Sequence, residues 1–356
     1  MAGSGPYETI GDYVMLKKWL AAACIMILTL SGCASSGEEH SQNDQDQIQE
    51  KIFATEKHED RYSYPLTGMG TTEKPSDRAV AVVINNHPKA RPQSGLQSAD
   101  IVYEVLAEGD ITRFLAIFQS QKPDKIGPVR SARDYMIDLA KGYDSLFIAH
   151  GYSPEAKQML QSGLIDNLNG IQYDGTLFKR SKDRKAPHNS YITFENIQKG
   201  AAEKQFKMTP APRPLPFYTD NESKHLSGRK VENVHIAYSK YSLFNADYRF
   251  DAKTKKMERY SGGEPTMDAE TKKPVLVDNL LIIETNHRVI DSKGRREIDL
   301  TSGGKAYWIQ RGVCREVEWR NENGRILPYE NGHFLPFVPG KTWINIVKSL
   351  DSVSFS

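Results

Sequence analysis

Residues 101–118 read Ile-Val-Tyr-Glu-Val-Leu-Ala-Glu-Gly-Asp-Ile-Thr-Arg-Phe-Leu-Ala-Ile-Phe, two apolar runs on either side of a Gly-Asp pair. Glycine often begins a two-residue hairpin turn, because it adopts positive φ without a steric cost. We therefore predict antiparallel strands at 101–106 and 111–118. If the pairing is regular, Glu104 and Arg113 become diagonal neighbours on one apolar face of the hairpin.

Two further strands are predicted on either side of this hairpin. Residues 79–84, Ala-Val-Ala-Val-Val-Ile, form a continuous apolar run, which indicates a strand buried on both faces. The polar sequence Asn-Asn-His-Pro at 85–88 ends that run. Residues 143–149 form the second run, and His150 follows it directly.

Helix start signals lie between and after these strands. Ser131 fits the N-cap of a helix over 132–141, and Ser153 followed by Pro154 fits the start of another. Strands that alternate with helices predict an α+β or α/β first domain with a mixed sheet, over residues 75–204.

The remainder of the chain has a different pattern. A proline-rich stretch at 205–228 predicts a connector between domains. Beyond it, short apolar runs are separated by Asn-Gly at 323–324 and 331–332 and by Pro-Gly at 339–340, which favour hairpins. We therefore predict a smaller, β-rich second domain over residues 229–356.

The N-terminal region carries a targeting signal. A basic start at residue 15 precedes an uncharged, mostly apolar run at 20–30 and the sequence Leu-Ser-Gly-Cys that ends at Cys33. The run is too short to span a hydrocarbon core of ~30 Å as a helix. We predict a lipoprotein signal peptide at 15–32 and diacylation of the Cys33 thiol, with residues 1–14 as an extension upstream of the natural start. An ordinary cleaved signal peptide and an uncleaved anchor are the alternatives.

The residues after Cys33 predict a tether. Residues 34–50 contain five acidic side chains and no lysine or arginine, so they cannot bury a core. We expect a disordered, lipidated tether over 33–74. Two or more acyl chains give stable attachment, which places the protein on the outer face of the cytoplasmic membrane.

Composition excludes several classes of partner and site. Lysine and arginine total 47 against 45 acidic residues, so the charge balance gives no reason to expect binding to nucleic acid. Cys24 and Cys33 fall in or at the end of the signal peptide, which leaves Cys314 alone in the folded part. We therefore predict no intramolecular disulfide, no metal site and no cofactor. Cys314 is expected to be a buried, inert thiol rather than a reactive one.

Candidate binding residues gather where strands and helices are predicted to end. Helix N-termini attract anions, and arginine side chains match the geometry of carboxylates and phosphates. Ligands of α/β sheets collect at the carboxyl ends of strands. We predict an anion-recognising cleft formed by Glu104, Arg113, Arg130, Arg133, His150 and His188. The alternative is that Glu104 and Arg113 form a structural ion pair, that Arg130 and Arg133 pair with Asp134 or Asp138, and that His150 is a structural histidine.

No standard catalytic motif is present, because the sequence lacks H-E-x-x-H, a P-loop and G-x-G-x-x-G. We therefore assign no catalytic residue and expect a binding or accessory protein of the cell envelope. Its ligand would be an anionic or glycan component of the wall, or a wall-synthesis protein. One alternative is an enzyme acting on wall polymers with Glu104 or Glu108 as acid or base. Another is a scaffold that binds an envelope protein through exposed strand edges.

The same residues resemble a known family. The matching segments are Ile101–Glu108, Ile111–Phe114, Ile126–Arg133, His150–Pro154, Ala186–Asn189 and Pro339–Trp343. They are similar to the YerB-type lipoproteins of Gram-positive bacteria, a family defined by a domain of unknown function. The resemblance implies a two-domain surface lipoprotein and supplies no reaction. The chain departs from the family at Asp110 and Tyr152, where the family usually or often has glycine.

Overall fold

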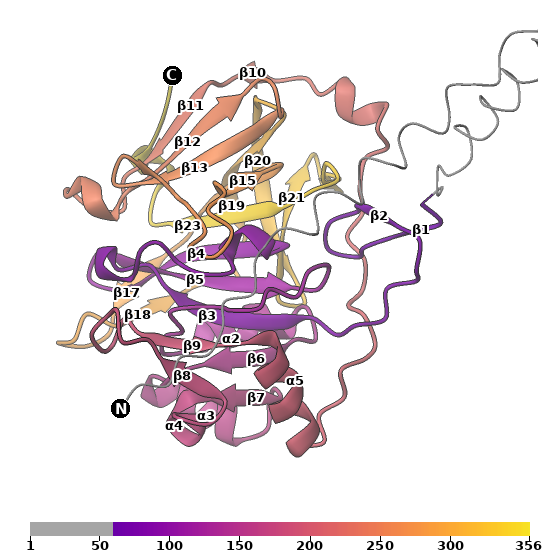
Figure 1. The fold of residues 1–356 in the computed structure, drawn as a ribbon. Coiled ribbons are helices and arrows are strands. Elements are labelled where there is room, and N and C mark those ends of the chain that lie inside the picture. Colours follow the sequence, from indigo (N-terminus) through magenta and orange to yellow (C-terminus); the bar gives the residue numbers. More distant parts are fainter. Residues whose placement is uncertain (1–59) are drawn as a thin grey trace, which may run out of the picture. The chain divides into compact units, whose positions relative to one another are not determined.

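The computed structural model describes residues 60–356 (Figure 1). The predicted upstream extension, the signal peptide, Cys33 and most of the predicted tether lie outside the described residues. Within this part of the chain, no helix is both long enough and apolar enough to cross a membrane.

One large mixed sheet runs through both domains. Its strands lie in the order β22 (His333–Phe334), β21 (Arg325–Glu330), β20 (Val313–Glu322), β19 (Gly304–Gln310), β16 (Asn279–Glu284), β23 (Thr342–Val347), β4 (Ile101–Glu108), β5 (Ile111–Phe118), β3 (Val80–Asn85), β6 (Leu146–Ala149) and β7 (Asn167–Asn169), with β10 (Arg229–Lys230) beside β20. The first domain contributes β3 to β7, and the second domain contributes the rest. The predicted fold class, a mixed-sheet first domain and a β-rich second domain, is confirmed.

Strand β23 joins the two domains. It pairs in parallel with β4 on one side and with β16 on the other, so that Ile344 lies opposite both Tyr103 and Leu281. All six residues of β23 are buried. The Pro-Gly pair at 339–340 therefore leads into the middle of the sheet, and the expectation that it forms a hairpin is wrong.

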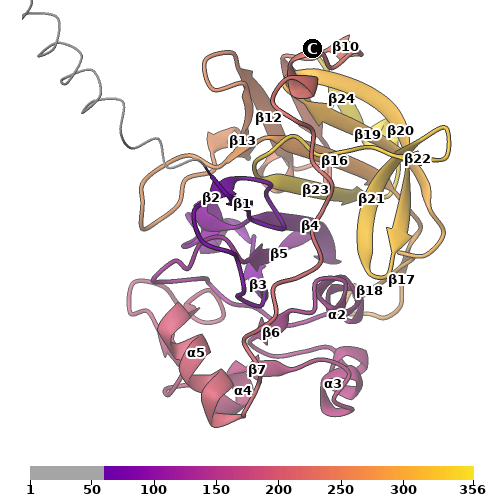
Figure 2. The same ribbon diagram turned by 90° about the vertical axis from the view of Figure 1, so that its right-hand side faces the viewer.

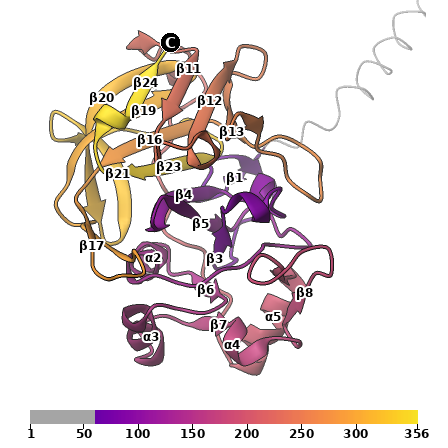
Figure 3. The ribbon, with the colours of Figure 1, turned by 90° about the vertical axis from the view of Figure 1, so that its left-hand side faces the viewer.

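A second sheet covers one face of the large one (Figure 3). Tyr248 and Met257 of the second sheet share an apolar core with Val102 and Ile282 of the large sheet. Its strands are β14 (Glu264–Pro265), β13 (Lys256–Ser261), β12 (Ala246–Asp251), β11 (Asn233–Ile236) and β24 (Val353–Phe355), with β15 (Leu276–Val277) beside β13.

Helices cover the part of the large sheet that belongs to the first domain (Figure 2). They are α2 (Asp134–Lys141), α3 (Pro154–Gln161), α4 (Gly170–Tyr173) and α5 (Phe194–Glu203), accompanied by the strand pairs β8 (Phe178–Arg180) with β9 (Ser190–Ile192) and β17 (His287–Val289) with β18 (Arg296–Ile298). Helix α2 packs into one core and α5 into the other. Strand β3 contributes side chains to both cores, so the prediction that it is buried on both faces is confirmed.

The β4–β5 hairpin turns at the predicted Gly-Asp pair, where Gly109 has φ of +54°. Its register differs from the regular pairing, because a β-bulge lies between Leu106 and Glu108. One extra residue reverses the alternation of side chains along a strand. Glu104 therefore lies opposite Phe114, while Arg113 lies opposite Val105. Glu104 and Arg113 point to opposite faces of the sheet, and the prediction that they are neighbours is wrong.

The predicted helix start at Ser131 is also wrong. Helix α2 begins after Arg133, which has no side-chain capping bond, and Ser131 instead donates a hydrogen bond to the carbonyl of His150 at 3.2 Å. The predicted cap at Ser153 is confirmed: its Oγ accepts a hydrogen bond from the backbone N–H of Ala156 at 3.2 Å.

The last part of the predicted tether is ordered. Strands β1 (Tyr62–Ser63) and β2 (Gly70–Thr71) pair with each other, and Leu66 between them is completely buried. The expectation of disorder is therefore wrong for residues 62–71. The connector is ordered as well, since the backbone N–H of Leu215 donates to the carbonyl of Pro65 at 2.9 Å.

The second domain contains the predicted Asn-Gly hairpins. Residues 323–324 link β20 to β21, and residues 331–332 link β21 to β22. Cys314 of β20 is only 4% exposed, and burial raises the pKa of its thiol to about 11. Since a thiol must ionise to react, Cys314 has the character of an inert core residue.

Candidate functional site

Three histidines and one arginine gather at the carboxyl ends of β3 and β6. These two strands are parallel neighbours, so His87 after β3 and His150 after β6 lie at the same edge of the sheet. Arg130 lies between the strand ends, because its backbone N–H donates to Val83 and its carbonyl accepts from the N–H of His150 at 2.9 Å. This edge is where α/β sheets bind ligands.

His188 reaches the same place from the segment between β8 and β9. Its ring stacks on that of His87, with 4.6 Å between the ring centroids and 27° between the ring planes. Nδ2 of Asn85 lies 2.9 Å from Nδ1 of His188. We call His87, Arg130, His150 and His188 the histidine–arginine site.

Hydrogen bonds identify the protonated nitrogens of the stacked pair. Oδ1 of Asn85 accepts from the backbone N–H of His87 at 3.0 Å, so Nδ2 of Asn85 must donate to Nδ1 of His188. Nδ1 of His87 accepts from the backbone N–H of Lys89 at 3.1 Å. When Nδ1 is an acceptor, a neutral imidazole carries its proton on Nε2. Both rings are therefore neutral and each keeps an Nε2–H donor.

His150 has the opposite tautomer. Nη2 of Arg180 donates to Nε2 of His150 at 3.1 Å, which leaves the proton on Nδ1 and directs it to Oγ of Ser190 at 2.7 Å. His150 therefore donates to Ser190 and does not act as its base in this arrangement. Gly170 is required beside this ring, since a Cβ there would lie 2.3 Å from Cγ of His150.

Burial and nearby positive charges lower the pKa values of the three histidines of the site. Burial, followed by Lys89, Arg91 and Arg130, lowers the pKa of His87. Burial also lowers the pKa values of His150 and His188, and the positive charge of Arg130 contributes to both shifts. All three imidazoles are thus held neutral beside a charged guanidinium.

Arg130 is the group in the site that lacks a partner. Burial and the nearby charge of Arg113 lower its pKa to about 10, and no carboxylate in the described part of the chain opposes these two effects. Within residues 60–356, its guanidinium makes no side-chain hydrogen bond or ion pair. A half-buried cation that no protein group satisfies is a natural site for an anionic ligand. Among the same residues, no three His, Cys, Asp or Glu side chains are placed so that they could hold one metal ion together, and this includes the three histidines of the site.

Arg113 and Arg133, predicted for the same cleft, are occupied by one carboxylate. Nη2 of Arg113 lies 2.6 Å from Oε2 of Glu108, and Arg133 bonds Oε1 of the same carboxylate. Nη1 of Arg113 also donates to the carbonyl of Ser131. The structure therefore separates the predicted residues into two groups. Arg130, His150 and His188 lie at one edge of the sheet, whereas Arg113 and Arg133 both form ion pairs with Glu108.

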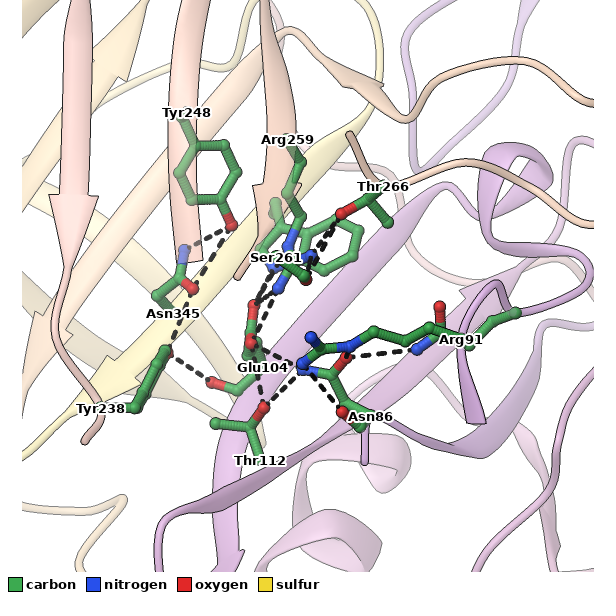
Figure 4. A network of polar contacts seen from close by, with 12 residues as sticks. Asn86, Arg91, Glu104, Thr112, Tyr238, Tyr248, Arg259, Ser261, Thr266 and Asn345 are labelled. Atoms are coloured by element: carbon green, nitrogen blue, oxygen red, sulfur yellow. Dashed lines mark hydrogen bonds and ion pairs between the residues drawn. The ribbon is translucent and has the colours of Figure 1, made fainter. Parts of the chain in front are cut away.

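Glu104 belongs to a closed network between the two domains (Figure 4). It forms an ion pair at 2.7 Å with Arg259 of β13, and both side chains are completely buried. Its oxygens also accept hydrogen bonds from Asn86, Thr112 and Trp343. A ligand in solvent therefore cannot reach the carboxylate of Glu104, and the prediction that Glu104 belongs to the cleft is wrong. As an acid or base on a polymer it would have no access to solvent, and Glu108 is held by two arginines.

Sequence reasoning missed His87, Arg180 and Arg259. His87 follows a buried strand, as His150 does, so the rule that selected His150 would have selected it too. Arg180 lies in a basic run that offers no signal for this contact. Arg259 pairs with a residue 155 positions away, and no local pattern indicates such a pairing.

Comparisons with known proteins agree with this fold. Residues 66–207 match the model of the N-terminal domain of the DUF3048 proteins of unknown function, and residues 234–344 match that of the C-terminal domain. A Bacillus subtilis protein named "Putative lipoprotein YerB" is 46% identical over 345 residues, which cover 96% of this chain and 98% of that protein. The crystal structure of Bacillus subtilis YerB superposes with a TM-score of 0.78 at 50% identity, covering 83% of this chain and all of that one. This chain is similar to YerB along almost its whole length. It therefore belongs to the DUF3048 family of two-domain proteins.

Proposed function

We propose that the protein is a lipid-anchored protein of the cell envelope that binds an anionic ligand at the histidine–arginine site. The anchor would be Cys33, on the outer face of the cytoplasmic membrane. The lipoprotein-type sequence that ends at Cys33 supports this placement, and so does the name of the Bacillus subtilis relative.

The single observation that carries the binding proposal is the unpartnered guanidinium of Arg130. Every other arginine named around the site has a partner: Arg113 and Arg133 share Glu108, and Arg180 pairs with Asp174 at 2.8 Å. A phosphate or carboxylate at Arg130 would gain charge-assisted hydrogen bonds. The Nε2–H groups of His87 and His188 are the remaining donors close by.

The ligand class follows from these donors. Uncharged donors and one guanidinium suit a group with several acceptor oxygens, such as a phosphodiester or a carboxylate. In the envelope, such groups occur on anionic wall polymers and on wall peptides, which makes a wall component our first choice of ligand. Neutral glycan or an envelope protein partner would make less use of Arg130.

Titration of the purified protein with teichoic-acid fragments and with muropeptides tests the proposal. Arg130→Ala should weaken binding of the recognised fragment by about tenfold or more, as expected for loss of a charge-assisted hydrogen bond. Arg320→Ala is the matched control, because Arg320 is an exposed arginine of the second domain and the charge change is the same. Equal affinities of the wild type and Arg130→Ala for every fragment would refute the proposal.

An enzymatic role requires a separate measurement. The carboxylates that the sequence offered for acid–base catalysis, Glu104 and Glu108, are both engaged by arginines. Incubation of the protein with purified wall, followed by analysis of released fragments, distinguishes cleavage from binding. Release that depends on either carboxylate would favour the enzyme over the binding protein.

A further inference from the structure

The loop that carries His87 is held in place by residues of the second domain. We call residues 85–93 the His87 loop. At the end of this loop, the backbone N–H of Ala269 in the second domain donates to the carbonyl of Gln93 at 2.7 Å. Two side-chain connections also join the loop to that domain, one through the buried carboxylate of Glu104 (Figure 4) and the other made by Arg91. Neither connection includes a group of the histidine–arginine site.

The first connection is a chain of three side chains. Nδ2 of Asn86 donates to Oε1 of Glu104 at 3.2 Å, and the same oxygen accepts from Nη2 of Arg259 at 2.9 Å. Asn86, Glu104 and Arg259 are 2%, 0% and 0% exposed, so water cannot replace any of them in this chain. The position of the amide of Asn86 is thus tied to a guanidinium from β13.

Arg259 is itself fixed by its surroundings. Its guanidinium lies over the rings of Phe114 and Trp343, at 5.0 Å and 4.8 Å from the ring centroids. Its Nη1 donates to Oγ of Ser261 at 2.5 Å and to Oγ1 of Thr266 at 2.7 Å. The second domain therefore presents this arginine to Glu104 in one orientation.

The second connection is made by Arg91. Its Nη1 donates to the carbonyl of Leu243 in the second domain at 2.9 Å. Its Nε and Nη2 donate to the side-chain and backbone oxygens of Asn86, at 3.1 Å and 3.0 Å. Asn86 is therefore held from both sides.

Asn86 lies directly between two residues that determine the site. Oδ1 of Asn85 accepts from the N–H of His87, and its Nδ2 donates to His188. Gln93 donates to both the carbonyl of Asn85 and Oδ1 of Asn86. A shift of Asn86 would thus move Asn85 and His87 together and alter the stacked histidine pair.

We propose that Arg259 is a positioning residue, through which the second domain sets the conformation of the His87 loop and so the affinity of the histidine–arginine site for anions. The predicted effect of Arg259 on anion affinity rests on the proposed function. The predicted effect of Arg259 on the histidines does not, because their titration can be followed without any ligand.

The experiment compares the purified full-length chain with the double variant Glu104→Gln/Arg259→Met, which leaves no unpaired charge buried. NMR titration gives the pKa values of His87, His188 and His150, and inorganic phosphate is the anionic probe. We expect the pKa values of His87 and His188 to rise toward the ordinary value, and phosphate affinity to fall about tenfold. His150, whose partners Ser190 and Arg180 lie outside the loop, should titrate as in the wild type.

Arg325→Gln is the matched control. Arg325 is a buried arginine of the second domain that donates to the carbonyls of Gly142 and Arg213 and makes no contact with the His87 loop. It should leave the titration of His87 and the phosphate affinity unchanged, even where it lowers stability. If the double variant does not fold, Asn86→Ala breaks the same connection and leaves the Glu104–Arg259 pair in place.

The outcomes are distinct. A folded double variant in which His87 and His188 titrate as in the wild type overturns the positioning role. A shifted titration in the double variant, together with phosphate that binds no variant including the wild type, supports the positioning role and counts against the proposed function. The same shift in Arg325→Gln would overturn the positioning role, because it would reduce the effect to general destabilisation.

Discussion

Removal of the charge of Glu104 tests how strongly the two domains are joined. Glu104→Gln exchanges one oxygen for an NH₂ group and leaves the guanidinium of Arg259 completely buried without a counter-charge. Breaking a buried ion pair by removing one partner costs about 3–5 kcal/mol. Because neither side chain has any contact with solvent, we expect E104Q to lower the free energy of unfolding by an amount within that range.

A second substitution distinguishes the cost of leaving Arg259 buried without a counter-charge from the cost of the hydrogen bonds that Glu104 loses. Arg259→Met removes the charge and places a thioether among Phe114, Trp343 and Tyr248, where sulfur–aromatic contacts are favourable. A buried pair has already lost its hydration, so replacing both members by uncharged groups is often close to neutral. We expect the double variant to lose less free energy of unfolding than the two single variants lose together, by at least about 2 kcal/mol.

Urea unfolding followed by tryptophan fluorescence measures these free energies, because Trp343 contacts both members of the pair. Linear extrapolation gives the free energy of unfolding in water for the wild type, the two single variants and the double variant. Losses that add within about 0.5 kcal/mol would show that Glu104 and Arg259 act independently. That result would refute the reasoning that the pair couples the domains.

Three other substitutions or conditions give further predictions. Burial, with Arg296 and Lys348 nearby, lowers the pKa of His287 to about 4, and neither ring nitrogen has a partner within residues 60–356. As pH falls, His287 of the unfolded chain therefore takes up a proton at a higher pH than His287 of the folded chain. Roughly 3 kcal/mol of stability should be lost between pH 6.5 and pH 4. His287→Phe should abolish this loss when the free energy of unfolding is measured in urea titrations. Gly170→Ala should displace the His150 ring and shift its NMR titration, whereas unchanged titration would contradict the close packing. Cys314 should resist alkylation at pH 8 until the chain is unfolded by denaturant, so rapid labelling of the folded protein would contradict its burial.

Much of the first domain could be predicted because its signals are local. A continuous apolar run indicates a strand with two covered faces, and 79–84 became such a strand, shifted by one residue. A Gly-Asp pair between apolar runs indicates a turn, and the chain turns there. A serine before a proline indicates a helix start, and Ser153 caps α3. In each case, residues close together in the chain determine the conformation.

The errors arose where one residue or a distant strand changed the outcome. The bulge after Leu106 adds a single residue to one strand, and no feature of the sequence distinguishes it from a regular pairing. That one residue moved Glu104 to the face opposite Arg113. The insertion of β23 between β4 and β16 brings together segments about 240 residues apart, and its flanking Pro-Gly pair looks like any hairpin turn.

The candidate site was predicted by residue type, and residue type alone cannot tell a satisfied charge from a free one. Arg113, Arg130 and Arg133 carry the same charge, yet Glu108 forms ion pairs with two of them and none with Arg130. The difference depends on which carboxylate each guanidinium reaches, and the fold decides this. A charge that is removed from water and has no protein partner destabilises the fold. Among these three arginines, Arg130 is therefore the one whose desolvation an anionic ligand can offset. By this criterion Arg130 is the residue on which anion binding should depend most.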